Sequence, residues 1–189
     1  MQLSLLRHGA TELSGAFRGS LDDPLTTQGW QQMWQGVQAL SGVEQLVSSP
    51  LQRCCLFAEK LAFQQQLPLT LDANWQELHF GDWEGKTAAE LMQTAEADLT
   101  QFWQDPLHFT PPNAEPLTAF IQRIEAALAQ LQAACKGKHV LLISHGGVMR
   151  YLLLKARGLP LSHLLQIEVP HGSLFTIDYR HSLDGTEHV

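Results

Sequence analysis

Two histidines in this sequence each follow a short apolar run and precede a glycine. His8 comes after the run that begins at Gln2, and His145 comes after the run that begins at Val140. Imidazole has an ordinary pKa of about 6.5, so one histidine can be a neutral nucleophile while another carries charge. Glycine has no Cβ atom and would let a ligand approach the backbone beside each ring. If the fold brings the two His-Gly pairs together, both histidines belong to a single functional site.

Three more residues with suitable chemistry lie near these positions or after other predicted strands. Arg7 precedes His8, Arg53 lies in the first turns of a predicted helix, and Glu77 follows the third predicted strand. Guanidinium groups present planar forks of N–H donors that match phosphate oxygens. A carboxyl group held among phosphate charges can stay protonated and donate to a leaving oxygen. Together these residue types predict phosphoryl transfer through a phosphohistidine.

The elements that must position these residues alternate between strand and helix. Short apolar runs predict strands at residues 2–6, 45–49, 69–73, 140–144 and 174–179. Apolar residues at helical spacing predict helices at 26–40, 51–66, 117–135 and 147–157, with shorter ones at 86–92 and 98–103.

This alternation predicts an α/β fold with three layers, in which a mostly parallel sheet is flanked by helices. Ligands of such sheets bind outside the carboxyl ends of the strands. All five candidate residues fall at that edge, and the helix that follows His145 would point backbone N–H groups at the same place.

We expect a single domain over residues 1–180, followed by a polar tail at 181–189. The segment from 80 to 116 shows no strand pattern and has four prolines between Pro106 and Pro116. We therefore expect a helical and loop insertion there.

The amino-acid composition argues against some classes of binding partner and indicates a cellular compartment. The net charge of −7 over 189 residues argues against nucleic acid and anionic membranes, which both need a basic face. The three cysteines (Cys54, Cys55 and Cys135) are odd in number and two are adjacent, so we expect reduced thiols in a cytoplasmic protein. No signal peptide pattern follows Met1, and no apolar run approaches the ~18 residues of a membrane helix. We expect a monomer or homodimer that acts on a small phosphorylated metabolite.

With these residues in place, the chain resembles the histidine phosphatase superfamily, which includes cofactor-dependent phosphoglycerate mutase. The matching stretches, in the family's order, are LLRHGATE, GSLDDPLTTQG, VSSPLQRC, ELHFGDWEG and LISHGGVMR. The resemblance implies a phosphoglycerate mutase-like fold and a phosphoric monoester hydrolase of the histidine acid phosphatase type. It also implies that neither a metal nor a cofactor is needed.

The same resemblance implies a role for each candidate residue. His8 would be the nucleophile, and Arg7, Arg53 and His145 would bind and neutralise the phosphoryl group. Glu77 would protonate the leaving group and then help to activate water. The further substrate-binding residues would be Gly9, Thr11, Ser14 and Gly146.

Within the family, the sequence is most similar to α-ribazole phosphatase, which removes the phosphate from α-ribazole 5′-phosphate in cobalamin nucleotide-loop assembly. This similarity lies in ELHFGDWEG, the proline-rich loop, and the helix that carries Phe120 and Arg123. The alternatives are a phosphoglycerate mutase, a broad-specificity small-molecule phosphatase and a non-catalytic binding module. A fourth alternative is a metal hydrolase, which would use His8, His79, His145 and Asp82. His171, just before the last predicted strand, could also reach the rim of the site.

Overall fold

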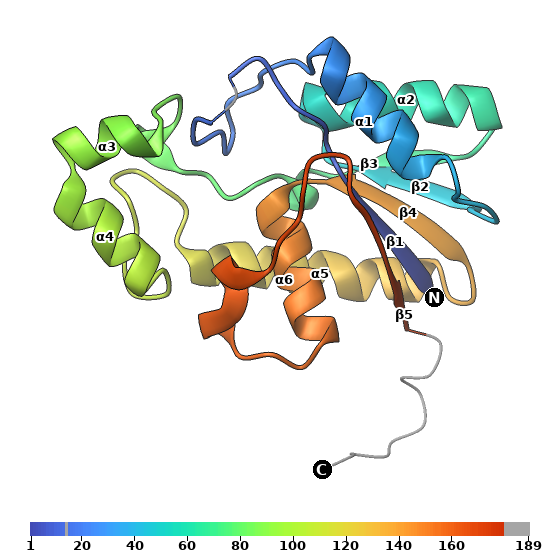
Figure 1. The fold of residues 1–189 in the computed structure, drawn as a ribbon. Helices are drawn as coiled ribbons and strands as arrows, with labels where there is room; N and C mark the ends of the chain where they lie inside the picture. Colours follow the sequence, from blue (N-terminus) through green and yellow to red (C-terminus); the bar gives the residue numbers. More distant parts are fainter. Residues whose placement is uncertain (14, 180–189) are drawn as a thin grey trace.

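A five-stranded sheet forms the centre of the computed structural model, which describes residues 1–13 and 15–179 (Figure 1). Its strands are β1 (Gln2–Arg7), β2 (Gln45–Ser48), β3 (Leu69–Leu71), β4 (His139–Ser144) and β5 (Leu174–Asp178). They lie in the order β3-β2-β4-β1-β5, and only β5 runs antiparallel to its neighbour. The predicted α/β class with a mostly parallel sheet is confirmed. Ser14 and the predicted tail at 181–189 lie outside the described residues.

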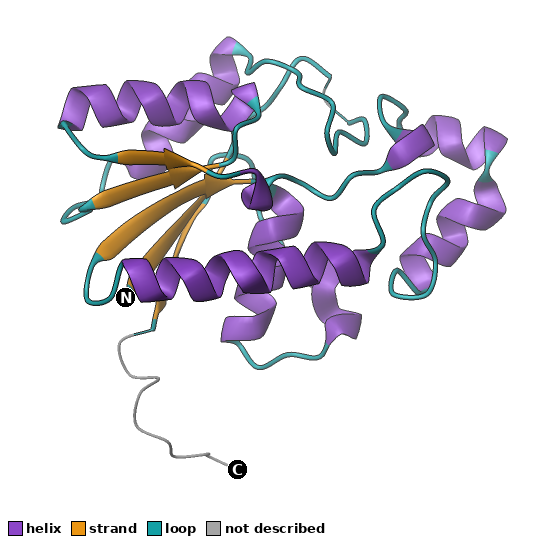
Figure 2. Ribbon diagram, turned by 180° about the vertical axis from the view of Figure 1, so that it is seen from behind, coloured by secondary structure: helices purple, strands orange, loops and turns teal. Residues whose placement is uncertain are grey.

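Helices cover both faces of this sheet (Figure 2). The helices α1 (Thr27–Val37) and α2 (Gln52–Gln65) pack on one face, and α5 (Leu117–Ala134) and α6 (Gly146–Ala156) pack on the other. Successive side chains of a strand point to opposite faces. Accordingly, Leu5 is buried in the core beneath α5 and α6, while Leu6 is buried in the core beneath α1 and α2. The chain therefore has three layers.

Local sequence explains where two of the elements begin and end. The Thr26 hydroxyl accepts a hydrogen bond from the Gly29 N–H at 3.0 Å and so caps α1. The third strand ends two residues earlier than predicted because Asp72 caps the 3₁₀ turn η1 (Ala73–Trp75), accepting from the Asn74 N–H at 2.9 Å. This turn redirects the chain toward Glu77.

The segment from 80 to 116 contains helices and loops but no strand. Its elements are η2 (Gly81–Trp83), α3 (Ala88–Thr94) and α4 (Glu96–Gln104). Aromatic rings join them to the rest of the fold: Trp83 packs edge-on against Phe102, with ring centroids 5.5 Å apart. In Figure 1 this segment stands to one side, beyond the carboxyl ends of the strands.

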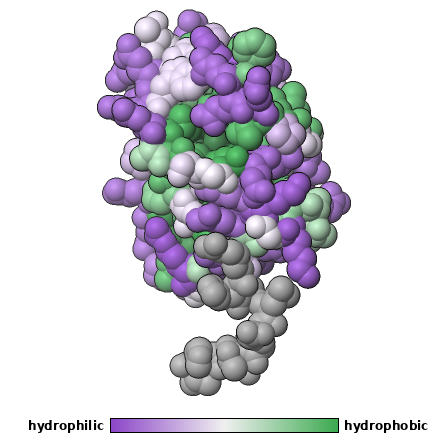
Figure 3. Space-filling view, turned by 90° about the vertical axis from the view of Figure 1, so that its right-hand side faces the viewer, coloured by the Kyte–Doolittle hydropathy of each residue, from purple (hydrophilic) through white to green (hydrophobic). Residues whose placement is uncertain are grey.

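The remaining element is η3 (Leu161–Gln166), a 3₁₀ segment that the sequence did not predict. No described helix is both long and apolar enough to cross a membrane. Figure 3 shows the face of the molecule opposite α3 and α4, where a group of apolar residues is surrounded by polar side chains.

Candidate active site

The carboxyl ends of the parallel strands bring the five predicted residues to one place. β1 and β4 are paired in register so that Arg7 lies opposite Ser144, and the next residue on each strand is a histidine. The rings of His8 and His145 consequently have centroids only 5.3 Å apart. A cavity of about 200 Å³ opens beside them, and the predicted residues that line it are Arg7, His8, Arg53 and Glu77.

His8 presents one free ring nitrogen. The ring is 3% exposed, and its Nδ1 lies 2.8 Å from the Gly9 carbonyl oxygen. Because a carbonyl can only accept, Nδ1 carries the hydrogen, and Nε2 of the neutral ring keeps its lone pair. Burial lowers the pKa of His8 well below its ordinary value, and the charges of Arg53 and Arg7 lower it further. His8 is therefore a neutral imidazole with a basic nitrogen at neutral pH.

His145 is fully buried and held at both nitrogens. Arg53 donates from Nε to Nδ1 of His145 at 3.2 Å, so the ring hydrogen lies on Nε2. That nitrogen lies 2.8 Å from the Ser49 hydroxyl. The Cys54 sulfur packs 3.7 Å from Nε2. Burial, followed by the charge of Arg53, lowers the pKa of His145 well below its ordinary value, so this ring too is neutral.

Arg53 is a buried cation whose donors all have acceptors. Its side chain is 1% exposed. Besides its bond to His145, it donates to the carbonyl oxygens of Leu21, Arg18 and Gly19 at 2.6, 2.8 and 2.9 Å. The Asp23 carboxylate lies 3.5 Å away. The guanidinium group is thus fixed in one orientation, with its positive charge beside the two histidines.

Arg7 differs from Arg53 because one of its donors is unused. Its Nη1 donates to the Val169 carbonyl, whereas Nε is buried and has no hydrogen-bond partner among the described residues. Burial lowers the pKa of Arg7 to about 10, so it remains a cation at neutral pH. An N–H group of this kind is suited to a phosphoryl oxygen.

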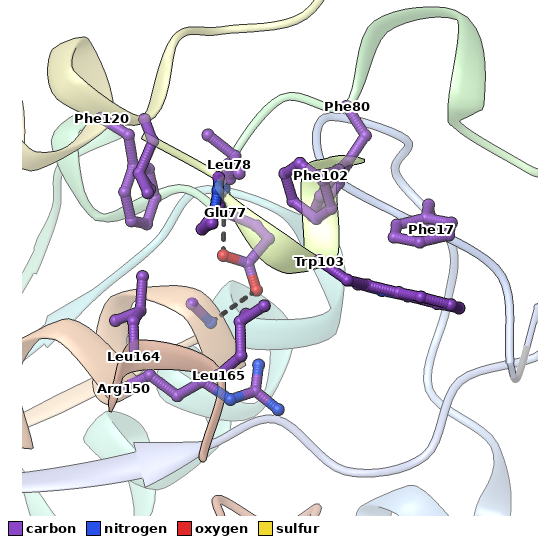
Figure 4. Close-up of a pocket in the computed structure, with 13 residues that line it drawn as sticks. Phe17, Glu77, Leu78, Phe80, Phe102, Trp103, Phe120, Arg150, Leu164 and Leu165 are labelled. Atoms are coloured by element: carbon purple, nitrogen blue, oxygen red, sulfur yellow. Dashed lines mark hydrogen bonds between the residues drawn. The ribbon is translucent and has the colours of Figure 1, made fainter. Parts of the chain in front are cut away.

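Glu77 lines the same cavity as His8, and backbone donors fix its carboxylate (Figure 4). Its Oε2 accepts from the Gly147 N–H at 2.9 Å, and its Oε1 accepts from the Leu78 N–H at 3.0 Å. A Cβ atom at Gly147 would lie 2.3 Å from Oε1 of Glu77. Gly147 is therefore needed for the carboxylate to reach the start of α6.

A second, larger cavity adjoins the first. It has a volume of about 310 Å³ and shares Phe17, Glu77, Phe80 and Arg150 with it. Most of its other lining is apolar, and Figure 4 shows aromatic rings on several sides: Phe102, Trp103 and Phe120. A phosphate in the smaller cavity would thus have an aromatic chamber beside it, with Glu77 between the two.

None of the additional substrate-binding candidates that the structure describes is in the lining of the smaller cavity. Gly146 contacts Arg7, since a Cβ atom there would lie 3.3 Å from its guanidinium carbon. At Gly9 the Cβ direction is occupied by α1, because a Cβ atom there would lie 2.0 Å from the carbonyl oxygen of Gly29. Thr11 is 1% exposed, and its hydroxyl has no partner among the described residues. Ser14 is outside the described residues.

Sequence reasoning missed several residues that the fold adds to the site. Arg18 and Arg150 both line the smaller cavity. Arg150 follows Gly147 by three residues on α6, so the helical spacing could have indicated it. Arg18 lies in a loop, and no periodic signal marks it. His171, by contrast, was expected near the rim of the site, and it packs against His8 with ring centroids 5.4 Å apart; burial lowers its pKa to about 4.

The residues of the metal-hydrolase alternative are not gathered together. His79 lies 3.8 Å from Glu84, and Asp82 accepts from the Asn113 side chain at 3.1 Å. Across residues 1–13 and 15–179, no group of three or more His, Cys, Asp or Glu side chains is placed to hold a metal ion.

The buried neutral histidines predict an acid-sensitive fold. The folded-state pKa values of His8 and His145 lie below the unfolded value of about 6.5, so the unfolded chain binds more protons below that pH. The free energy of unfolding should therefore be highest above pH 6.5 and fall by about 1.4 kcal/mol per pH unit for each histidine below it. Urea unfolding at pH 7.5, 6.5 and 5.5 measures this, and H8N should show a shallower dependence. A stability that stays constant from pH 7.5 to 5.5 would contradict the burial of neutral rings.

Comparison with known proteins finds relatives over most of the chain. A family model described as "Histidine phosphatase superfamily (branch 1)" matches residues 3–186. The adenosylcobalamin/alpha-ribazole phosphatase of Escherichia coli (strain K12) is 31% identical over 182 residues, covering 94% of this chain and 90% of that protein. The "Probable phosphoglycerate mutase GpmB" of Citrobacter koseri is 32% identical over 187 residues, covering 97% and 87%.

Solved structures share the same fold. The crystal structure of the alpha-ribazole phosphatase from Shigella flexneri superposes with a TM-score of 0.82 at 30% sequence identity, covering 94% of this chain and 90% of that one. A mycobacterial glucosyl-3-phosphoglycerate phosphatase superposes with a TM-score of 0.80 at 26% identity, covering 93% and 88%. The shared fold therefore spans nearly the whole chain.

Proposed function

Since this chain belongs to the histidine phosphatase superfamily and is a phosphoric monoester hydrolase, we propose that it transfers the phosphoryl group of its substrate to His8 and then to water. The resemblance noted in the sequence is confirmed by the family match. The observation that carries the proposal is a neutral His8 whose free Nε2 belongs to a cavity also lined by Arg7 and Glu77.

In the first step, Nε2 of His8 attacks phosphorus and the bond from phosphorus to the ester oxygen breaks. Glu77, which lines the same cavity, gives its proton to the departing oxygen. In the second step, a water molecule attacks phosphorus while Glu77 takes its proton. The bond from phosphorus to nitrogen then breaks, which releases phosphate and restores neutral His8.

The negative charge that develops on the phosphoryl oxygens is stabilised by the guanidinium groups of Arg7 and Arg53, which both line the cavity. Arg7 lines the cavity and supplies positive charge there. Arg53 and His145 act as a fixed pair: the guanidinium supplies positive charge, and the hydrogen bond between them holds the neutral imidazole in place beside His8. Such groups need no reorganisation during the reaction, because burial has already fixed them.

The candidate substrate is α-ribazole 5′-phosphate. Two features support it: similarity to proteins named for this activity, and the aromatic chamber beside the phosphate cavity. A flat benzimidazole base would stack among Phe80, Trp103 and Phe120, because offset and edge contacts between rings are favourable. The ribose would then span the opening beside Glu77.

A panel of phosphomonoesters tests this assignment. α-Ribazole 5′-phosphate, p-nitrophenyl phosphate, glucose phosphates and 3-phosphoglycerate should all be assayed for phosphate release. We expect the highest kcat/KM for α-ribazole 5′-phosphate. Formation of 2-phosphoglycerate from 3-phosphoglycerate with 2,3-bisphosphoglycerate present would instead establish a phosphoglycerate mutase. Similar kcat/KM across the panel would establish a broad-specificity phosphatase.

The acid role of Glu77 predicts a dependence on the leaving group. In E77Q the amide cannot donate a carboxylic proton, so kcat should fall by about 10²- to 10⁴-fold for an alkyl phosphate. The loss should be much smaller for p-nitrophenyl phosphate, because nitrophenolate leaves without a proton. Single-turnover measurement of alcohol release reads this step directly. Equal losses for both substrates would contradict the assignment.

A further inference from the structure

A second carboxylate, Glu84, lies in the segment before α3 and is not part of the cavity lining. It is nevertheless 11% exposed and accepts hydrogen bonds on both oxygens. Its Oε1 accepts from the N–H groups of Ser20 and Phe80 at 2.7 and 3.1 Å. Its Oε2 accepts from the Ser20 hydroxyl and the Leu21 N–H at 2.9 and 2.8 Å. Two of these bonds run to the backbone of residues 18–21, which we call the carbonyl loop.

The carbonyl loop is also the support of Arg53. Three of its four carbonyl oxygens, those of Arg18, Gly19 and Leu21, accept from the Arg53 guanidinium. The loop therefore turns its N–H groups toward Glu84 and its carbonyl groups toward Arg53.

One peptide unit joins the two charges directly. The carbonyl of Gly19 and the N–H of Ser20 belong to the same peptide group. That N–H donates to Glu84 at 2.7 Å, and that carbonyl accepts from Arg53 at 2.9 Å. Hydrogen bonds in such a series polarise one another, so a carboxylate on the N–H side strengthens the carbonyl as an acceptor. Glu84 thus acts on the buried cation through one peptide group.

The peptide group between Gly19 and Ser20 is closely packed against its neighbours. A Cβ atom at Gly19 would lie 2.2 Å from the carbonyl oxygen of Leu78 and 2.4 Å from Oε1 of Glu84. The neighbouring backbone is joined as well, since Phe17 and Gly85 share a hydrogen bond of 2.9 Å. In Figure 1 the segment between β1 and α1 reaches across to the turn before α3. The carbonyl loop consequently has little freedom while Glu84 is in place.

We propose that Glu84 is a positioning residue for phosphoryl transfer: it fixes the carbonyl loop, the loop fixes the guanidinium of Arg53, and Arg53 fixes His145. This inference rests on the proposed function, in which the charge of Arg53, paired with His145, stabilises the transferred group. Glu84 does not touch the substrate. Without the Glu84 carboxylate, the carbonyl oxygens of the carbonyl loop should accept more weakly and hold Arg53 less firmly. A displacement of about 1 Å in a catalytic group can lower a rate by about 10²-fold.

The test compares E84Q with E90Q. Glu90 is a matched control because it lies in the same segment and also accepts two hydrogen bonds, from the N–H and the hydroxyl of Thr87 at 2.7 and 2.8 Å. It caps α3, and its side chain accepts hydrogen bonds from Thr87 and not from the carbonyl loop. In E84Q we expect kcat for p-nitrophenyl phosphate to fall by about 10- to 100-fold and inhibition by vanadate to weaken. In E90Q both quantities should stay within about twofold, since surface changes of this kind have small effects.

A spectroscopic measurement reports on Arg53 without any substrate. The Nε–H signal of Arg53 in a ¹H–¹⁵N spectrum, assigned by its loss in R53K, should be protected from exchange in the parent and in E90Q but not in E84Q. An unchanged Arg53 signal in folded E84Q would overturn the proposal, and so would equal loss of protection in both variants. If E84Q does not fold, E84D takes its place, because it keeps the charge but shortens the reach.

The two measurements also separate this inference from the proposed function. Selective loss of the Arg53 signal in E84Q supports the positioning role even if the parent protein hydrolyses no phosphomonoester in the panel. In that event the proposed function fails while the structural link from Glu84 to Arg53 stands.

Discussion

Replacement of His8 by alanine should lower kcat by about 10⁴-fold or more, on the scale observed when a catalytic nucleophile is removed. The reason is that no other described side chain presents a free, neutral imidazole nitrogen to this cavity. His145 has partners at both ring nitrogens, and His171 does not line the cavity. Without His8 only direct attack by water remains.

Covalent labelling tests directly whether the phosphohistidine intermediate forms on His8. Brief incubation with a ³²P-labelled monoester and an alkaline quench should leave label on the parent protein, and that label should be released by acid. H8A should carry none, whereas H108A should be labelled like the parent, because His108 is an exposed residue paired with Asp105. If H8A turned over p-nitrophenyl phosphate at the parental rate, the phosphohistidine mechanism would be disproved.

The second large effect is expected at Arg53, where one substitution should lower both stability and activity. In R53K the ammonium group cannot bond His145 and the carbonyls of Leu21, Arg18 and Gly19 at once, so buried acceptors lose their donors. Breaking a buried charged network costs about 3–5 kcal/mol, and we expect a decrease in unfolding free energy of this order. The kcat/KM should also fall by about 10²- to 10³-fold, because a fixed electrostatic donor is lost.

Urea unfolding and steady-state kinetics on the same samples test both parts. The matched control is R157K, since Arg157 is exposed at the end of α6. It should unfold and react like the parent. If R53K kept the parental stability, the guanidinium network could not be a major support of the fold. If it kept the parental kcat/KM, Arg53 could not stabilise the transferred group.

The main architecture and the meeting of the histidines could be predicted from the sequence for a physical reason. Continuous apolar runs indicate buried parallel strands, and the carboxyl ends of such strands share one edge. His8 and His145 each come directly after such a run. The pairing of β1 with β4 therefore sets the distance between the two histidines. Their proximity can be predicted without knowing the structure of the loops.

The surroundings of these residues could not be predicted in the same way. Arg18 and Glu84 lie outside regular helices and strands, and their positions depend on contacts between loops that have no periodic signal. The aromatic chamber is a similar case, because Trp103 comes from α4 and Phe120 from α5, on opposite sides of the proline-rich loop. The close approach of α1 to Gly9, through Gly29, could not be predicted either, because it is a tertiary contact.

The pairing of β1 has a consequence for how the protein folds. β1 is the first strand of the chain, yet its two neighbours are β4 and β5, the last two strands. During synthesis, β1 cannot pair with either neighbour until residue 139 and those after it have been made. Such non-local pairing slows folding. A ribosome-bound chain that ends before β4 would expose an apolar strand and lack His145. Such a truncated chain would be prone to aggregation and could not acquire partial activity.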